Sequence, residues 1–297
     1  MDFYAVSPRL RKPDPFLNAF EQTMELADAH GLRGVLLFDG NSVPFSPWVL
    51  AQHILTRTAS LLPLIAAGPA YVAAEDAART IAGLHRLYRR SVAVNLVAGA
   101  ESRTGSHANR YQALLDFSLT LDARLERPGE SRPIATRFVA GHSADAGRLA
   151  TKLGASNLRM LSSTLDAGVP AGCGLNFGVV TRPTSDEAWA AANDLFPHRA
   201  DTARLARRAA SITDSQWKTE VLSESTSAPG YWRDPAQSLR ADAPFYVGSY
   251  NDLARLFAQL RGAGVSAALL DLPPSADEYA HLSRAFAVSA DLSAGER

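Results

Sequence analysis

The residues best suited to bind a charged ligand are Ala140-Gly141-His142-Ser143, where an apolar run ends and a helix is expected to begin. The first N–H groups of a helix lack helical acceptors, and together with the helix dipole they suit an anion. Ser143 adds a hydroxyl donor, and a protonated His142 would either strengthen phosphate binding or crowd it. The alternative is plain capping of the helix by Ser143. We predict a phosphate contact at Gly141, His142 and Ser143.

A second polar position is Asn95, inside the aliphatic run 91–98, which Ala98 closes and Gly99 follows. An asparagine in an aliphatic strand must find hydrogen-bond partners, and a glycine allows close backbone approach. This strand end therefore either contacts a ligand or caps a loop.

Two aspartates, Asp39 and Asp271, directly follow strand-like runs. Parallel barrels keep catalytic groups at the carboxyl ends of their strands, so Asp39 is a candidate catalytic residue and Asn41 a candidate substrate contact. Each aspartate could equally cap the helix that follows it.

The triplet Tyr231-Trp232-Arg233 offers aromatic and cationic groups to a bound substrate. It lies in the stretch 223–243, which is rich in Ser, Pro, Ala and Asp and has no periodicity. A stretch of this kind in a compact barrel is usually a mobile lid, a binding loop or disordered. The triplet could instead pack on the protein surface or on a partner.

The elements that must position these residues alternate regularly along the chain. Strands are expected at 2–7, 33–38, 62–67, 91–98, 134–140, 157–162, 175–181 and 266–271. Helices are expected at 15–30, 48–60, 73–88, 107–125, from about 143, from 184, at 246–262 and at 275–287. This alternation predicts an α/β fold, a (β/α)8 TIM-type barrel, with an open doubly wound sheet as the alternative. We expect one domain over 1–297, with a long insertion between the seventh and eighth strands.

Composition excludes several classes of protein. The 30 Lys and Arg balance the 30 Asp and Glu, so no field is expected that would gather nucleic acid or an anionic membrane. The single cysteine, Cys173, excludes an intrachain disulfide and a cysteine-built metal site, and no metal is expected. We see neither a signal peptide nor a run long enough to span a bilayer, so we expect a soluble, cytoplasmic protein.

Several segments together resemble the bacterial alkanesulfonate monooxygenases, members of the luciferase-like flavin-dependent monooxygenase superfamily. These segments are GVLLFDGN at 34–41, NLVAGAE at 95–101, Arg110-Tyr111, AGHSADA at 140–146, RPTSDEAW at 182–189 and the stretch 247–270. Each is weakly specific alone, and their order and spacing over nearly the whole chain carry the resemblance.

The resemblance implies a luciferase-like barrel that uses reduced FMN, supplied by a separate flavin reductase, to activate oxygen. In such relatives the segment matching Asn95, Ala98 and Gly99 lies against the flavin. The positions that match Arg110-Tyr111 and the turn at 141–143 frame its phosphate. Relatives pair through helices on one side of the barrel, which implies a homodimer or a heterodimer with a luciferase-like subunit. A neighbouring branch uses a deazaflavin, which is the weaker alternative cofactor.

The chain departs from this family in the seventh strand. Relatives carry an arginine and a histidine there, and the matching positions are Asn176 and Gly178. A glycine can neither transfer a proton nor pair with a sulfonate, and the reactive cysteine of relatives is replaced by Val43 or a neighbour. We therefore do not expect desulfonation, and Asn176 is kept as a candidate catalytic residue.

Two functions follow. The first is an FMN-dependent monooxygenase acting on a specialised, non-sulfonate small molecule, because flavin oxygen chemistry belongs largely to the cofactor. The second is a catalytically degenerate scaffold, or the silent subunit of a heterodimer, that binds flavin weakly or not at all. We favour the first.

Overall fold

The computed structural model describes residues 1–99, 107–125, 133–163, 170–197, 201, 204–205, 208, 228–238 and 240–295. The chain divides into two compact units. The N-terminal unit comprises residues 4–158, and the C-terminal unit comprises residues 1–3 and 159–297.

The N-terminal unit alternates strands and helices. Its strands are β1 (Asp2–Val6), β2 (Gly34–Leu37), β3 (Leu62–Ala67), β4 (Val92–Leu96), β5 (Ile134–Ala140) and β6 (Ser156–Met160), of which β1 and β6 each extend into the other unit. Neighbouring strands pair in parallel in this order. Its helices are α1 (Pro13–Ala29), α2 (Pro47–Arg57), α3 (Ala74–Tyr88), α5 (His107–Leu125) and α6 (Ala144–Lys152).

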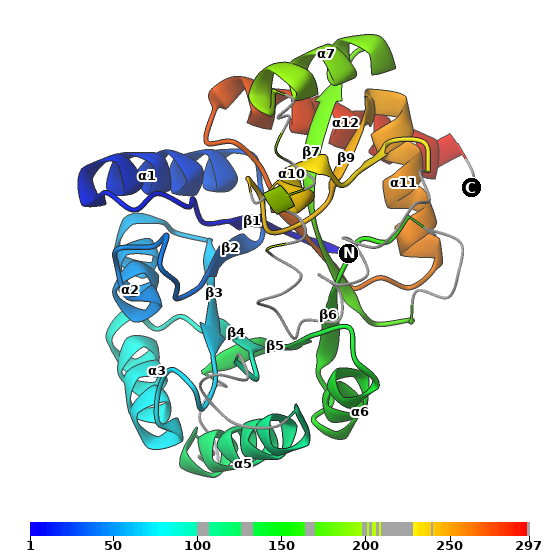
Figure 1. The fold of residues 1–297 in the computed structure, drawn as a ribbon. Helices are drawn as coiled ribbons and strands as arrows, with labels where there is room; N and C mark the ends of the chain where they lie inside the picture. Colours follow the sequence, from blue (N-terminus) through cyan, green and yellow to red (C-terminus); the bar gives the residue numbers. More distant parts are fainter. Residues whose placement is uncertain are drawn as a thin grey trace. The chain divides into compact units, whose positions relative to one another are not determined.

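Strands β2, β3 and β4 form because their aliphatic residues are almost all buried, as in parallel sheets covered by helices. Every residue of β2 and of β4 is buried. Figure 1 shows α1, α2 and α3 along the outer side of β2, β3 and β4. Asn95 is therefore a polar residue within a fully buried strand.

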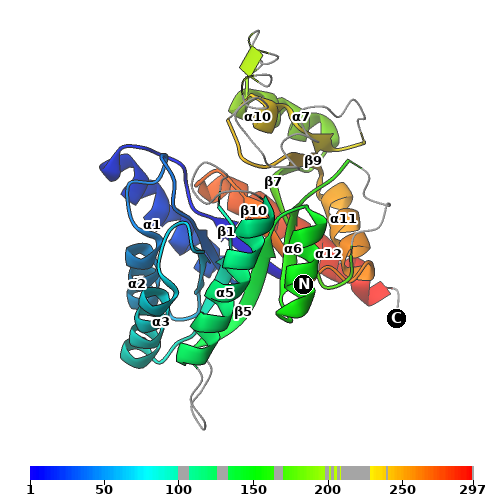
Figure 2. The ribbon, with the colours of Figure 1, turned by 60° about the horizontal axis from the view of Figure 1, so that its bottom comes forward.

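The C-terminal unit is built around β7. Its elements are β7 (Gly174–Arg182), α7 (Ser185–Leu195), β8 (Tyr231–Trp232), α10 (Asp234–Gln237), β9 (Phe245–Ser249), α11 (Tyr250–Gly262), β10 (Ala267–Asp271) and α12 (Ala276–Gly295). The first half of β7 pairs in parallel with β10 and its second half with β9. The short strand β8 pairs antiparallel with β9. Helices α11 and α12 lie side by side (Figures 1 and 2).

The strand order confirms the predicted fold class. It runs β10-β1-β2-β3-β4-β5-β6-β7, and β10 also pairs with β7, which is the topology of a parallel (β/α)8 barrel. Strands β8 and β9 belong to the insertion between β7 and β10 and are additional to this topology. The open doubly wound alternative does not apply.

The helix expected over 246–262 was wrong at its beginning. Residues Phe245–Ser249 form the buried strand β9, and α11 begins only at Tyr250. Ser249 caps α11, because its hydroxyl accepts from Asp252 N while the Asp252 carboxylate accepts from Ser249 N. This capping box moves the helix start to the end of β9.

Part of the expected lid, 223–243, contains regular structure. Its described residues include β8 and α10, whereas residues 223–227 and 239 lie outside the described part. Tyr231 and Ala236 are buried in the C-terminal unit. Whether this segment closes over a site stays a prediction.

Residues 1–3 are held by the C-terminal unit. The Asp2 amide donates to the Ser266 carbonyl at 2.9 Å. The Phe3 ring packs against Phe257 and Phe286, with ring centroids 4.9 and 4.5 Å away. The start of β1 is therefore anchored by residues near the far end of the sequence.

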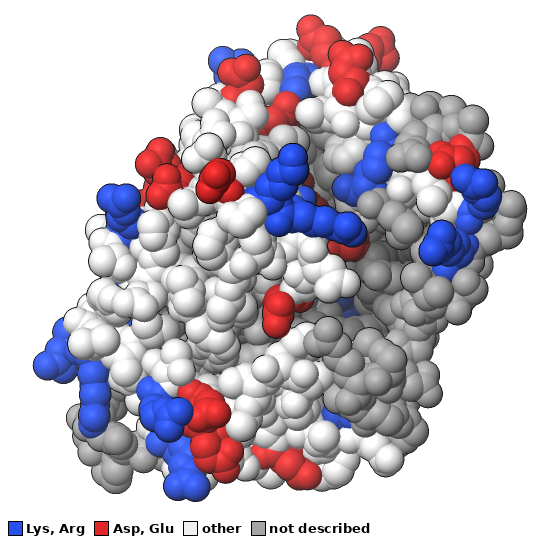
Figure 3. Space-filling model, turned by 60° about the vertical axis from the view of Figure 1, so that its left-hand side comes forward, with Lys and Arg blue, Asp and Glu red and all other residues white. Residues whose placement is uncertain are grey.

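Acidic and basic side chains alternate over the face shown in Figure 3 and leave wide uncharged areas between them. No helix within the described ranges combines the length and the apolar character needed to cross a bilayer.

Candidate active site

The turn between β5 and α6 requires a glycine at position 141. Gly141 has φ +141°, a backbone conformation that other residues rarely adopt. A Cβ there would lie 2.7 Å from the Tyr111 hydroxyl and 2.9 Å from the Ala146 Cβ. Gly141 therefore makes room for the Tyr111 hydroxyl beside the turn.

The same turn is clamped by Asn157 of β6. Its Nδ2 donates to the carbonyl oxygens of Val139 and Gly141, each at 2.9 Å. These bonds fix the Gly141 carbonyl and so orient the peptide that leads into α6. From the sequence, Asn157 was placed in a strand and this role was missed, because the turn that its side chain reaches lies 16 residues earlier in the chain.

Tyr111 and Ser143 meet at the N-terminus of α6. The Ser143 hydroxyl donates to the Tyr111 hydroxyl at 3.2 Å and accepts from Ala146 N at 3.2 Å. Ser143 is thus the helix cap, the role that was the alternative to a phosphate contact, and α6 directs its first N–H groups to the same place. Two hydroxyls and a helix N-terminus converge here, an arrangement that suits an anion. His142 is half-buried in the same turn, and the nearby Asp145 is paired with Arg148 at 2.5 Å.

The end of β4 is held by a buried arginine. Gly99 has φ +80°, and its carbonyl accepts from Arg110 Nη1 at 2.6 Å. Arginines are usually solvated, but Arg110 is only 5% exposed and binds the Gly99 carbonyl just after β4. Ala98 is buried beside it in sequence. Since Arg110 and Tyr111 are adjacent on α5, one helix turn supports both the β4 end and the β5 turn.

Asn95 carries an unused acceptor. Its side chain is 5% exposed, and its Oδ1 has no hydrogen-bond partner among the residues that the structure describes. A buried carboxamide oxygen without a donor costs about 1–3 kcal/mol. A ligand with an N–H group would remove that cost.

Asp39 and Asn41 make none of these contacts. Both are exposed in the loop after β2, and α2 is capped by Ser46, whose hydroxyl accepts from Trp48 N. The alternative role of Asp39 as the cap of this helix is therefore wrong. Its catalytic role stays a prediction.

The positions that the resemblance assigns to arginine and histidine lie together on one side of β7. Asn176 is 7% exposed, and its Oδ1 is unpartnered within the described ranges. A Cβ on Gly178 would lie 2.3–2.4 Å from carbons of the Phe245 ring. Phe245 of β9 thus fills the space that a side chain at position 178 would need, a replacement that the sequence did not reveal.

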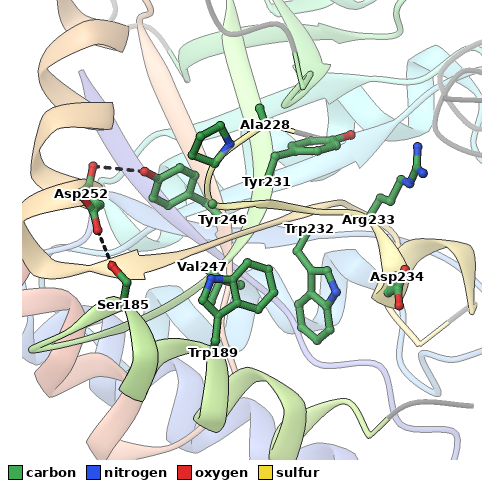
Figure 4. Close-up of a pocket in the computed structure, with 12 residues that line it drawn as sticks. Ser185, Trp189, Ala228, Tyr231, Trp232, Arg233, Asp234, Tyr246, Val247 and Asp252 are labelled. Carbon is green, nitrogen blue, oxygen red and sulfur yellow. Dashed lines mark hydrogen bonds between the residues drawn. The ribbon is translucent and has the colours of Figure 1, made fainter. Parts of the chain in front are cut away.

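The triplet 231–233 lines a cavity of about 850 Å³ in the C-terminal unit. Figure 4 shows Trp189 of α7 and Trp232 of β8 on one side of the β8 ribbon, with Tyr231 and Arg233 on the other. The indole centroids of Trp189 and Trp232 are 5.6 Å apart in an edge-to-face arrangement. A cavity of this size and aromatic character suits a small organic molecule.

Another part of the cavity wall contains the carboxylate of Asp252, which already accepts hydrogen bonds from neighbouring side chains. The Asp252 carboxylate accepts from the hydroxyls of Ser249 at 2.6 Å and Ser185 at 2.7 Å. The Ser249 hydrogen bond, aided by that of Ser185, holds the pKa of Asp252 below its usual range. Burial, followed by the charge of Asp252, raises the pKa of Tyr246 to about 12, so this phenol stays protonated at neutral pH.

Comparisons with known proteins agree with this geometry. No family model matches the chain. It is 24% identical over 313 residues to the monooxygenase BtrO of Niallia circulans, covering 91% of this chain and 90% of BtrO. BtrO acts on a 4-(gamma-L-glutamylamino)butanoyl group carried by the BtrI acyl-carrier protein.

Two solved structures share the fold. EDTA monooxygenase from Chelativorans has a TM-score of 0.72 at 14% identity, over 99% of this chain and 94% of its own. The oxygenating constituent of the Pseudomonas putida 3,6-diketocamphane monooxygenase, solved with FMN, has a TM-score of 0.63 at 13% identity, over 96% and 95%.

The topology defines a parallel (β/α)8 barrel, the class of fold in which functional sites lie at the carboxyl ends of the strands. The chain is thus similar in sequence to one monooxygenase and shares its fold with others, in line with the resemblance that its motifs carry.

Proposed function

We propose that this chain is an FMN-dependent monooxygenase that uses reduced flavin and oxygen on a specialised, non-sulfonate small molecule. The observation that carries the proposal is the convergence of the Tyr111 and Ser143 hydroxyls at the N-terminus of α6. Gly141 allows this arrangement, because a side chain there would overlap the Tyr111 hydroxyl.

The residues fit such a cofactor. The FMN phosphate is a dianion that the first turn of α6, Ser143 and Tyr111 would hold, with His142 at the edge of the turn. The buried Asn95 carboxamide oxygen offers an acceptor to an N–H group of the flavin ring, next to Ala98 and Gly99.

The division of work between cofactor and protein follows from this arrangement. Bound reduced flavin supplies the activation of oxygen. The protein binds the phosphate, and Arg110 fixes the Gly99 carbonyl at the end of β4. Asp39 and Asn176 are the proposed polar groups for the reacting substrate, and the unpartnered Oδ1 of Asn176 supports its part.

The substrate is proposed to lack a sulfonate because positions 176 and 178 of β7 offer it no cationic or protonating group. Asn176 and Gly178 replace the expected arginine and histidine, and the Phe245 ring makes the surface beside Gly178 apolar. The related enzymes act on an acyl group on a carrier protein, on EDTA and on a diketocamphane. Their diversity agrees with a substrate class specific to this chain.

The phosphate contribution can be measured directly by titrating the protein with FMN and with riboflavin, which lacks the phosphate. We expect FMN to bind more tightly, and Ser143→Ala to weaken FMN binding about 10-fold or more, since a hydrogen bond to a charged group contributes about 1.5–3 kcal/mol. Riboflavin binding should hardly change. Tyr111→Phe should act in the same direction.

Thr184→Ala is the matched control, because Thr184 caps α7 in a capping box of its own. It should cost about 1 kcal/mol of stability and leave the ratio of FMN to riboflavin affinity unchanged. Equal affinity of FMN and riboflavin would contradict the phosphate site. Absence of any binding of FMN or a deazaflavin, with no oxygen uptake from reduced FMN, would favour the degenerate scaffold instead. Tighter binding of the deazaflavin would assign the alternative cofactor.

The proposal includes two partners. A separate reductase would supply the reduced flavin, and a second luciferase-like chain, identical or homologous, would form a dimer. Val49 of α2 and Leu87 of α3 are 58% and 75% exposed, and pairing through these helices would bury such apolar side chains.

A further inference from the structure

The cavity beside β8 contains a cationic group that is not used within the described part of the protein. Arg233 lines the cavity, and its Nη1 is shielded from solvent without a hydrogen-bond partner among the described residues. Guanidinium groups are rarely left in this state, because a buried donor that lacks an acceptor loses its hydration without compensation.

The other walls are aromatic. Trp189, Trp232 and Tyr246 line the cavity, and the Gly230 backbone lies against the Tyr246 ring, since a Cβ at Gly230 would approach that ring to 2.7 Å. Aromatic walls bury large apolar areas and favour a planar or apolar ligand body.

The acidic residues of the cavity do not neutralise Arg233. Asp252 is satisfied by Ser249, by Ser185 and by Arg255 at 3.2 Å. Asp234 follows Arg233 in sequence and also lines the cavity, but it does not accept a hydrogen bond from Arg233 Nη1. The Arg233 guanidinium thus keeps unused hydrogen-bonding capacity at Nη1 among the described residues.

We propose that this cavity is the binding site for an organic anion, in which Arg233 binds a carboxylate or phosphate group and the aromatic walls of the cavity contact the apolar body. Because guanidinium pairs with either oxyanion through parallel hydrogen bonds, both belong to one ligand chemistry. This inference rests on the proposed function in one respect: the anion is the substrate of the flavin enzyme or a part of it.

The proposal is tested with four phenyl probes that differ in charge: phenylacetate, phenyl phosphate, the neutral phenylacetamide and the cationic benzylamine. Binding is followed by indole fluorescence, to which Trp189 and Trp232 contribute, and by ligand-observed NMR. We expect at least one anion to bind about tenfold or more tightly than the amide, and benzylamine to bind most weakly. The ratio of phenylacetate to phenyl phosphate affinity identifies the head group.

Arg233→Ala should abolish the preference for anions, and Arg233→Lys should retain part of it. Trp232→Phe should reduce the fluorescence change. Arg79→Ala is the control, because Arg79 is an exposed arginine of α3 that is paired with Asp76. If Arg233→Ala does not fold, the Lys variant and Trp232→Phe still carry the test.

Equal binding of amide and anion, or an unchanged preference in Arg233→Ala, would overturn the proposal. So would the loss of FMN binding in Arg233→Ala, because that would assign Arg233 to the cofactor. FMN titration of the wild type is a separate measurement, so a missing flavin site and a missing anion site are distinguished.

Discussion

Buried or half-buried polar residues, rather than the exposed ones, define the candidate site. Arg110 and Asn157 are the two donors that fix the β4 end and the β5 turn. The sequence identified the turn itself, because glycine and serine before a helix have a known chemistry. It could not identify Asn157 or the burial of Arg110, because both depend on which loop each side chain reaches across the fold.

At the residue scale, Gly178 stands where the resemblance implies a histidine, and the Phe245 ring occupies the space that a side chain there would need. We predict that Gly178→Ala lowers the free energy of unfolding by about 1–3 kcal/mol, because the new methyl group overlaps the Phe245 ring. Chemical denaturation measures the change. In a Phe245→Leu background the same substitution should cost less, since the two positions are coupled.

Gly83→Ala is the control for this prediction. Gly83 lies in α3, and a Cβ added to it would have no neighbouring atom within 4 Å, so alanine should stabilise the helix by up to about 1 kcal/mol. A Gly178→Ala variant as stable as the wild type would contradict the overlap.

At the scale of elements, the helix N-termini show where the sequence predicted the fold correctly and where it did not. Ser143 and Thr184 precede α6 and α7 as expected, and both use their hydroxyls as caps. Ser249 was missed, although Ser249 and Asp252 have the spacing of a capping box, because the apolar residues of 245–248 fit a strand or a helix equally well. The pairing of β9 with β7, which settles the choice, is non-local.

The carbonyl groups at the C-terminal end of α2 are bound by Arg90, which lies more than 30 residues further along the chain. Arg90 donates to the carbonyls of Thr58 and Leu61 and, at 3.3 Å, to that of Leu55. We predict that Arg90→Ala lowers the free energy of unfolding by about 1.5–3 kcal/mol, because these carbonyls lose a charged donor. Thermal and chemical denaturation measure the loss.

Arg79→Ala again serves for comparison, since the exposed ion pair of Arg79 is worth about 0–1 kcal/mol. If the two arginine variants lose the same stability, Arg90 is not an effective cap. Burial lowers the pKa of Arg90, an effect that the charge of Asp28 opposes.

At the scale of the whole molecule, residues 1–3 belong to the same compact unit as residues 159–297. Phe3 packs on Phe257 of α11 and Phe286 of α12. We predict that Phe3→Ala destabilises the protein by about 2 kcal/mol or more, because it removes a ring from this cluster. Leu119→Ala, at a side chain that is 52% exposed, should change stability by less than about 0.5 kcal/mol. A melting temperature unchanged by Phe3→Ala would contradict the anchoring role.

The anchoring of Phe3 also sets the order of events on the ribosome. Phe3 is translated long before Phe257 and Phe286, so its ring has no native partners while most of the chain is being made. Residues 4–158 can condense as their helices emerge, but the other unit cannot be completed until α12 has left the exit tunnel. Early release of a truncated chain would therefore leave the start of β1 unpaired and open to chaperones or proteases.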